Sequence, residues 1–204
     1  MMLQISEIPD ELVLEQQDDK LWAAFQSGSP QAFEAIYRQH YAHLYSYGWQ
    51  LCRDTDLLRD AIQNLFVDIW RSKQNLAQVK QVRFYLFKIL RRKILATLKE
   101  ERKKEEVHSE LLTYDFLAST YSDEQLELLD KLKEAVSRLS KKQREVIFLR
   151  YYENLSCEEI AELMQLNINT VYNHNTAAIR HLRLQFEKNK LILLMSTFPS
   201  LFML

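Results

Sequence analysis

A row of polar side chains recurs along one side of a short segment near the C-terminal end of the chain. Its members carry amide, hydroxyl or guanidinium groups: Asn169, Thr170, Tyr172, Asn173, Thr176 and Arg180. These groups recognise a ligand through hydrogen bonds. Asparagine can pair with the edge of adenine, and arginine with the edge of guanine, in the major groove of DNA. The row therefore predicts recognition of DNA bases.

Two predicted helices joined by a tight turn would position this row. Ser156 and Glu159 form a capping-box pattern at the start of the first helix, and Asn167 can cap the second. The apolar side of the second helix consists of Ile168, Val171, Ala178, Ile179 and Leu182. Residues 155–183 therefore predict a helix-turn-helix whose second helix enters the major groove. The alternative is a plain helical hairpin, which is common in all-α proteins.

A second cluster combines cationic and aromatic side chains on a helix that we predict from Gln81 to Glu106. The cations are Arg83, Lys88, Arg91, Arg92, Lys93 and Lys99, and the aromatic residues are Phe84, Tyr85 and Phe87. Cations neutralise phosphates, and aromatic faces can stack on unpaired bases. This combination favours binding of melted DNA. A hydrophobic core is the other interpretation of the aromatic residues, and we favour it for Phe84 and Phe87.

The net charge of −1 conceals four blocks of opposite sign. Residues 1–70 carry a net charge of −7, and residues 71–104, with 12 basic and 2 acidic side chains, carry +10. Residues 105–135 carry −7 and residues 136–204 carry +3. Such segregation suggests a polyanionic partner for the basic blocks. The acidic blocks could rest against the basic ones in the free protein and lower non-specific DNA binding.

The chain is predicted to be all-α, with two small helical DNA-binding domains joined by a flexible linker. Glycine occurs only twice and proline only three times, which is poor material for β-hairpins. Helices are expected over Asp18–Gln26, from Pro30 with Ser29 as its cap, and over Asp56–Lys73. The expected divisions are a loose acidic lead (1–17), a first domain (18–106), a linker (107–122), a helix-turn-helix domain (123–188) and an apolar tail (189–204).

The sequence disfavours an enzyme and a metal protein. It has no glycine-rich phosphate loop and no recognisable nucleophile motif, so no cofactor is expected. His40 and His43 lie three positions apart, but further metal ligands are not evident. Cys52 and Cys157 are far apart and no signal peptide precedes them, which favours a reducing, cytoplasmic compartment.

The order of these segments resembles the extracytoplasmic-function sigma factors of bacterial RNA polymerase. The first domain carries the resemblance in AFEAIYRQHYAHLYSYGWQL, DAIQNLFVDIW and VRFYLFKILRRKILATLKEERKK. The second carries it in AVSRLSKKQREVIFLRYYENLSCEEIAELM and the helix that follows. Together these segments span about residues 20 to 188. The resemblance implies a protein that binds core RNA polymerase and directs promoter recognition, DNA melting and transcription initiation.

The resemblance also implies three binding surfaces. Asp60, Gln63, Asn64 and Asp68 would bind the polymerase clamp, with Phe66 and Trp70 mostly in the core. The minus-ten element would be bound by Asn75, Gln78, Lys80, Arg83, Tyr85, Lys88, Arg91, Arg92 and Lys93. The polar row on the second helix of the helix-turn-helix, from Asn169 to Arg180, would bind the minus-thirty-five element. Tyr85 stands where the family usually has tryptophan, and both a core role and a base-binding role stay open.

The helix-turn-helix departs from the family pattern at several positions. Gln165 replaces the usual glycine of the turn, which predicts either a different turn or backbone strain. Asn175 replaces an apolar residue. Tyr172, Asn173 and Ala177 stand where basic residues are common, which predicts a weaker grip on phosphates and an unusual upstream sequence preference.

The partners implied are the clamp and flap of core polymerase, promoter DNA, and an anti-sigma factor or other regulator. The uncharged tail Leu191–Leu204 has 14 residues, fewer than the about 20 that span a bilayer, so we expect it to pack on the second domain or on a partner. Two alternatives remain: a helix-turn-helix regulator that acts without polymerase, and a helical adaptor protein.

Overall fold

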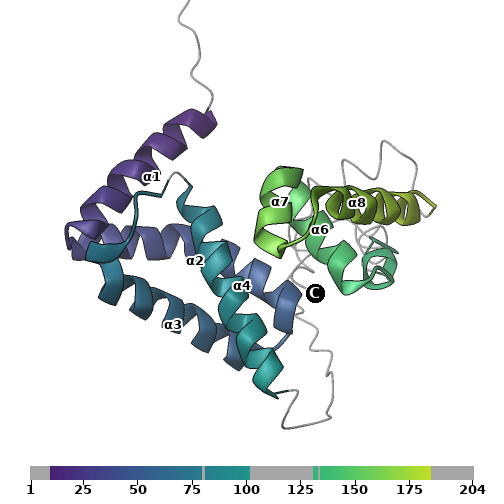
Figure 1. Cartoon of the computed structure of the whole chain (residues 1–204), viewed down its shortest axis with the longest axis horizontal. Coiled ribbons are helices and arrows are strands. Elements are labelled where there is room, and N and C mark those ends of the chain that lie inside the picture. Colours follow the sequence, from purple (N-terminus) through teal and green to yellow (C-terminus); the bar gives the residue numbers. More distant parts are fainter. Residues whose placement is uncertain (1–9, 80, 102–130, 133, 185–204) are drawn as a thin grey trace, which may run out of the picture.

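A computed structural model describes residues 10–79, 81–101, 131–132 and 134–184, and all their regular elements are helical (Figure 1). The first four α-helices are α1 (Asp10–Gln26), α2 (Pro30–Cys52), α3 (Thr55–Ser72) and α4 (Val82–Glu101), with the short 3-10 helix η1 (Lys73–Asn75) before α4. After a further helical stretch within 131–137 come α6 (Lys141–Tyr151), α7 (Cys157–Met164) and α8 (Ile168–Arg183). The predicted all-α class is confirmed. The predicted linker and tail lie outside the described residues.

Side-chain caps mark the starts of α2, α3, α6, α7 and α8. The hydroxyl of Ser29 accepts a hydrogen bond from the Ala32 N–H at 3.2 Å, and the Asp54 carboxylate accepts from the first turn of α3. Helix α1 differs from the prediction, because it begins at Asp10 rather than at Asp18. The expectation of a loose lead is therefore wrong for residues 10–17.

The N-terminal unit, α1 to α4, is built around α2. Gly48 makes this packing close, because a Cβ atom there would lie 2.2 Å from Leu58 Cδ1 of α3 and 3.2 Å from Ile94 Cδ1 of α4. Phe66 and Phe87 are buried, as predicted. Phe84 and Trp70 are only partly buried against the same core. Tight packing at Gly48 therefore fixes how α3 and α4 lie on α2.

The C-terminal unit, residues 131–184, contains the predicted helix-turn-helix in α7 and α8. The capping box at the start of α7 is formed in both directions: Ser156 Oγ accepts from the Glu159 N–H at 3.1 Å, and Glu159 Oε2 accepts from the Ser156 N–H at 2.7 Å. Asn167 Oδ1 accepts from the Asn169 N–H at 2.8 Å at the start of α8. Val171, Ala178 and Leu182 are buried on the inner side of α8.

Two of the departures from the family pattern, at Gln165 and Asn175, have a structural consequence within this unit. Gln165 ends α7 in the left-handed conformation, with φ 55° and ψ 47°, so the turn keeps the usual geometry and a residue with a side chain adopts it. The Oδ1 atom of Asn175 is buried and has no hydrogen-bond partner among the described residues. Both features lower the stability of this unit.

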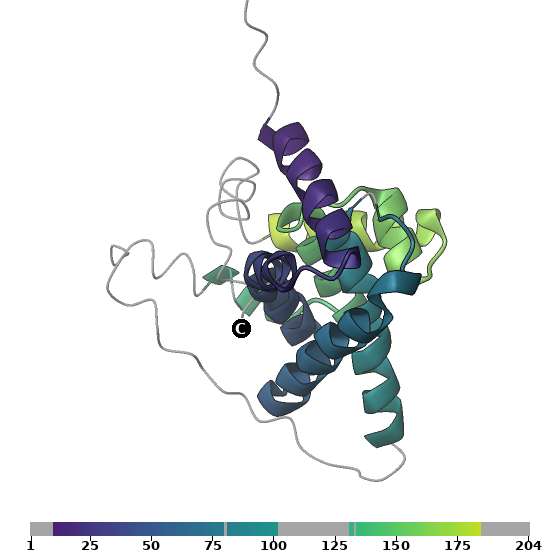
Figure 2. The same cartoon turned by 90° about the vertical axis from the view of Figure 1, so that its left-hand side faces the viewer.

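The two units lie against each other in a closed arrangement. Helix α6 packs on α2, and α7 contacts α4 (Figures 1 and 2). The Tyr47 ring of α2 stacks on Phe148 of α6, with 6.1 Å between ring centroids. Both side chains are fully buried, so this contact excludes water.

Replacing Gln165 by glycine should stabilise the protein. Glycine has no Cβ, so it removes the strain of the left-handed backbone. We expect the removed strain to exceed, by about 0.5–1 kcal/mol, the cost of the greater conformational entropy of glycine in the unfolded chain. Chemical denaturation of the full chain would measure the change. The control Thr176→Gly, within α8 and exposed, should lower stability instead. A destabilised Q165G variant would contradict the assignment of strain to this turn.

Candidate nucleic-acid and protein interfaces

The outer side of α3 gathers the residues predicted to bind the polymerase clamp. Asp60, Gln63, Asn64 and Asp68 are all exposed, while the opposite side of the helix, including Ile62 and Leu65, is buried. Asp68 also forms an ion pair with Lys93 of α4. The hydrogen bond from Lys93 lowers the pKa of Asp68. The α3 surface is thus polar, and Asp68 links it to α4.

Helix α1 holds the loop that precedes α4. Gln26 Nε2 donates to the Leu76 carbonyl at 2.6 Å, and Trp22 Nε1 donates to the Ala77 carbonyl at 3.3 Å. Both predicted base readers are exposed: Asn75 is the last residue of η1, and Gln78 lies in the loop. Lys80 lies outside the described residues. The roles of Trp22 and Gln26 were not predicted, and no local sequence pattern identifies them, because their partners lie 55 and 50 positions away.

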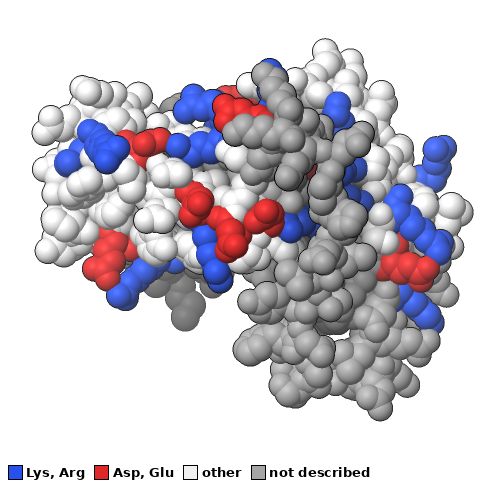
Figure 3. All heavy atoms as spheres, turned by 90° about the horizontal axis from the view of Figure 1, so that it is seen from below, with Lys and Arg blue, Asp and Glu red and all other residues white. Residues whose placement is uncertain are grey.

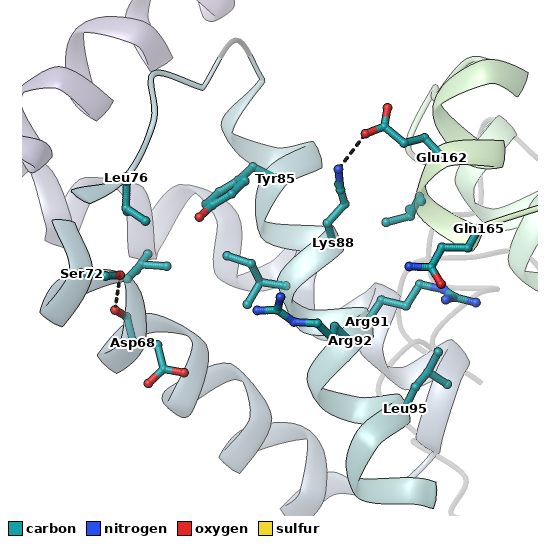
Figure 4. A pocket seen from close by; sticks show the side chains of 13 residues that line it. Asp68, Ser72, Leu76, Tyr85, Lys88, Arg91, Arg92, Leu95, Glu162 and Gln165 are labelled. Carbon is teal, nitrogen blue, oxygen red and sulfur yellow. Dashed lines mark hydrogen bonds and ion pairs between the residues drawn. The ribbon is translucent and has the colours of Figure 1, made fainter. Parts of the chain in front are cut away.

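Tyr85 has both a packing contact and access to a cleft. Its ring meets the Trp22 ring edge-on, with 5.6 Å between centroids, and burial raises its pKa. It also lines a cleft of about 620 Å³ that α3, α4 and the end of α7 enclose (Figure 4). Leu76, Lys88, Arg92 and Gln165 line the same cleft. Tyr85 is therefore partly packed and partly accessible from the cleft, and its role in binding a base stays a prediction.

The cations predicted on α4 divide into paired and unpaired residues. Arg83, Lys88 and Arg91 form ion pairs with Glu153, Glu162 and Glu145 of the C-terminal unit, at 3.5, 2.7 and 2.9 Å. Lys93 pairs with Asp68 within the N-terminal unit. Arg92 is exposed and forms no ion pair with any described residue.

Carboxylates of the C-terminal unit were not predicted to contact α4. As in these ion pairs, acidic side chains lie beside basic ones on the face shown in Figure 3. The sequence contains one indication that Glu145 is buried, because this residue adjoins the apolar run Val146–Leu149 on a short helix.

Glu145 is the centre of a buried network between the units. Its Oε1 atom accepts a hydrogen bond from Tyr47 Oη at 2.9 Å and one from Arg91 Nε at 2.9 Å. Burial raises the pKa of Tyr47 well above its ordinary value, so its hydroxyl stays protonated and donates. Glu153 is buried as well and lies 3.1 Å from His43 Nδ1.

Helix α8 presents the row predicted to read the minus-thirty-five element. Asn169, Tyr172, Asn173, Thr176 and Arg180 are exposed, and Tyr172 is unusually open for an aromatic residue, with 46% of its surface accessible. Thr170 is half-buried. The row thus lies on the outer side of α8, opposite Val171 and Ala178.

His40 is buried in the N-terminal unit without a hydrogen-bond partner among the described residues. The nearest carboxylate oxygen, Asp18 Oδ2, is 4.0 Å from Nε2, which is too far for a hydrogen bond. Burial, with smaller contributions from Arg83 and His43, lowers the pKa of His40 to about 4. Within the described residues, no group of three or more His, Cys, Asp or Glu side chains could hold a metal ion.

Two families match the two halves of the chain. Residues 36–104 match the family described as Sigma-70 region 2, and residues 129–182 match Sigma-70, region 4. The chain is an extracytoplasmic-function sigma factor. Sigma factors of this kind direct promoter recognition and transcription initiation by RNA polymerase. The presence of both regions rules against a plain helix-turn-helix regulator and a helical adaptor.

Known relatives of this sigma factor support the assignment. It is 26% identical to RNA polymerase sigma factor SigV of Bacillus subtilis (strain 168), over 74% of this chain and 89% of that protein. It is 28% identical to ECF RNA polymerase sigma factor SigL of Mycobacterium tuberculosis (strain ATCC 25618 / H37Rv), over 76% of this chain and 88% of that protein.

Two solved structures share its fold. The sigma factor RpoE from Bartonella quintana, solved in complex with the anti-sigma factor NepR, matches with a TM-score of 0.61 and 20% identity, over 77% of this chain and 98% of that chain. CnrH, solved in complex with the cytosolic domain of CnrY, matches with a TM-score of 0.56 and 22% identity, over 82% and 95% of the two chains. Among the described helices of this sigma factor, none is long and apolar enough to cross a membrane.

The buried His40 predicts a loss of stability at acidic pH. The unfolded chain protonates this imidazole near pH 6.5, whereas the folded protein does so only near pH 4. Its contribution to stability is therefore intact above pH 6.5 and declines as the pH falls from 6.5 to 4, by about 3 kcal/mol. In His40→Leu this part of the pH dependence should vanish. Denaturation of both proteins between pH 4 and 7.5 would measure it, and identical slopes would contradict the prediction.

Proposed function

We propose that the N-terminal unit binds core RNA polymerase through α3 and the minus-ten element through the loop before α4 and α4 itself. The observation that carries this proposal is the placement of both surfaces on one unit. Asp60, Gln63 and Asn64 are exposed on α3. Asn75 at the end of η1 and Gln78 are exposed on either side of Leu76 and Ala77, whose carbonyls α1 binds. A fixed loop lowers the entropy lost when a base is held. Polymerase binding and capture of melted DNA can thus occur together.

Within α4, we assign phosphate binding to Arg83, Lys88, Arg91, Arg92 and Lys93, together with Lys80. Tyr85, at the edge of the cleft, is suited to contact an unpaired base, because part of its ring packs on Trp22 and is held in place. We also propose that residues 107–122 are a linker and that residues 123–188 form the helix-turn-helix domain, while the first domain includes the whole of α1 from Asp10.

For the C-terminal unit, we propose that α8 reads the minus-thirty-five element and that the same unit contacts the polymerase flap. The exposed amides Asn169 and Asn173, with Tyr172 and Arg180, support base contacts more than phosphate contacts. An unusual upstream preference follows from this composition.

An anti-sigma factor is proposed as the regulator of this protein. The anti-sigma factor NepR is bound to the sigma factor RpoE, and the cytosolic domain of CnrY is bound to CnrH, and this chain shares the fold of both RpoE and CnrH. We further propose that the protein acts in the cytoplasm, where core polymerase is found, and that it performs no catalysis of its own. The test of the whole assignment is run-off transcription with purified core enzyme and a library of genomic promoters, where absence of any specific transcript would reject it.

Charge reversal on α3 should weaken binding to core polymerase. Asp60→Lys places a cation on a surface that is proposed to bind a surface of complementary charge on the polymerase. The expected loss of affinity for core polymerase is about tenfold. Glu100→Lys, an equal charge change on the same unit, is the control and should retain affinity. Binding of labelled protein to core enzyme without DNA measures both. If the two variants bind core enzyme with equal affinity, the interface does not include Asp60.

Substitutions in α8 should change which upstream sequence is preferred. Asn173→Ala and Thr176→Ala each remove a hydrogen-bonding group, at an expected cost of about 1–3 kcal/mol at a contacted base pair. Transcription from promoters with a randomised upstream element, by holoenzyme carrying each variant, would show the altered preference. A preference identical to that of the unmodified protein would reject both residues as base readers.

A further inference from the structure

Two side chains of α1 bind the backbone of the loop before α4, residues 76–79. Gln26 Nε2 donates to the Leu76 carbonyl at 2.6 Å, and Trp22 Nε1 donates to the Ala77 carbonyl at 3.3 Å. Among the described residues, no other side chain donates a hydrogen bond to the backbone of 76–79. The loop passes beside α1 on its way to α4 (Figure 1). Its position therefore depends on α1.

Aromatic rings of α1 also contact the segments on both sides of the loop. Towards α4, the Trp22 ring meets the Tyr85 ring edge-on, with 5.6 Å between centroids. Towards η1, Phe25 lies 6.3 Å from Trp70, and the Lys73 ammonium lies 4.1 Å from the centroid of the same Trp70 ring. Trp22 and Phe25 are fully buried, so these contacts exclude water. Helix α1 thus contacts the segments where the loop begins and ends.

The bound carbonyls lie next to the predicted base readers. Asn75, the last residue of η1, directly precedes Leu76, and Gln78 directly follows Ala77. Both readers are exposed, so their amide groups are free to meet a ligand while the backbone between them is held. A group that is already held loses less conformational entropy on binding than a mobile one. The bonds from α1 therefore favour one arrangement of the two amides.

We propose that Gln26 and Trp22 are positioning residues for minus-ten recognition: they hold the loop in the conformation in which Asn75 and Gln78 select a base. This inference rests on the proposed reading of the minus-ten element by this loop. In this role neither α1 residue touches DNA. Specificity is a difference between affinities, and a loop that adopts several conformations fits several sequences about equally well. Loss of either bond therefore lowers discrimination between minus-ten sequences.

A purely structural role of α1 gives a different expectation. If α1 only stabilised the N-terminal unit, weakening it would lower activity at every promoter alike. Positioning instead predicts a change in the preferred minus-ten sequence, with core binding and the upstream preference retained. The ratio of transcription from different minus-ten sequences separates the two roles, because a uniform loss of active protein leaves this ratio unchanged.

The test compares Gln26→Met with Gln39→Met in the full chain. Q26M removes the donor to Leu76 and keeps an unbranched side chain. Q39M is the matched control, because Gln39 Nε2 donates to Asp18 Oδ1 of α1 at 2.6 Å, a bond that does not involve the loop. Holoenzyme with each variant transcribes a library of promoters with a randomised minus-ten element. Q26M should lower the ratio of preferred to disfavoured sequences about fivefold, and Q39M should leave it unchanged.

Trp22→Phe removes the other donor and keeps an aromatic ring, so it should change the ratio in the same direction. Mobility of the loop is measured without DNA or polymerase, from the spectrum of a spin label at Ala77→Cys in a Cys52→Ser background. The label should become more mobile on the nanosecond timescale in Q26M and stay unchanged in Q39M.

An unchanged minus-ten ratio in Q26M, or an equal fall in Q39M, would overturn the positioning role. Asn75→Ala and Gln78→Ala then show which proposal has failed. If they alter the minus-ten preference, the loop reads DNA and only the role of α1 is rejected. If they do not, the proposed reading by the loop is rejected as well. If Q26M fails to fold, Gln26→Glu, which has the same size and cannot donate when ionised, takes its place.

Discussion

Glu145 is a carboxylate that Tyr47 and Arg91 solvate in place of water. A buried charge is tolerated only when partners satisfy it, so the position of α6 is tied to the positions of α2 and α4. The stacking of Tyr47 on Phe148 surrounds this network with apolar surface. The relation between the units therefore follows from one charged group that needs both of them. Any state in which the units separate has to return that group to water.

Each unit is organised so that its packing leaves a polar side free for recognition. In the N-terminal unit, Gly48 lets α3 and α4 approach α2 closely, and the outer side of α3 remains available. In the C-terminal unit, the capping boxes fix where α6 and α7 begin, and the buried side of α8 determines which residues face outward. Packing thus determines which side chains form the exposed surface in both units.

Helix α4 contributes to more than one part of the protein, and its side chains divide accordingly. Its inner side, with Leu86, Phe87 and Leu90, completes the core. Its cations contact one carboxylate of α3 and three carboxylates of the C-terminal unit. Arg92 alone among the α4 cations from 83 to 93 makes no ion pair with a described residue. A single helix thereby links the core, the proposed polymerase surface and the proposed DNA surface.

The sequence by itself determined the features that depend on neighbours within one or two helical turns. Capping at Ser29 and Ser156, the helix-turn-helix and the outward row of α8 follow from spacings of three and four residues. The order of segments also identified the family. Tertiary structure decided the contacts that join distant positions: the loop held by Trp22 and Gln26, the burial of His40, and the pairing of Arg83, Lys88 and Arg91 with glutamates. A charge pattern shows that such residues need partners, but only the packed fold determines which partner lies within bonding distance.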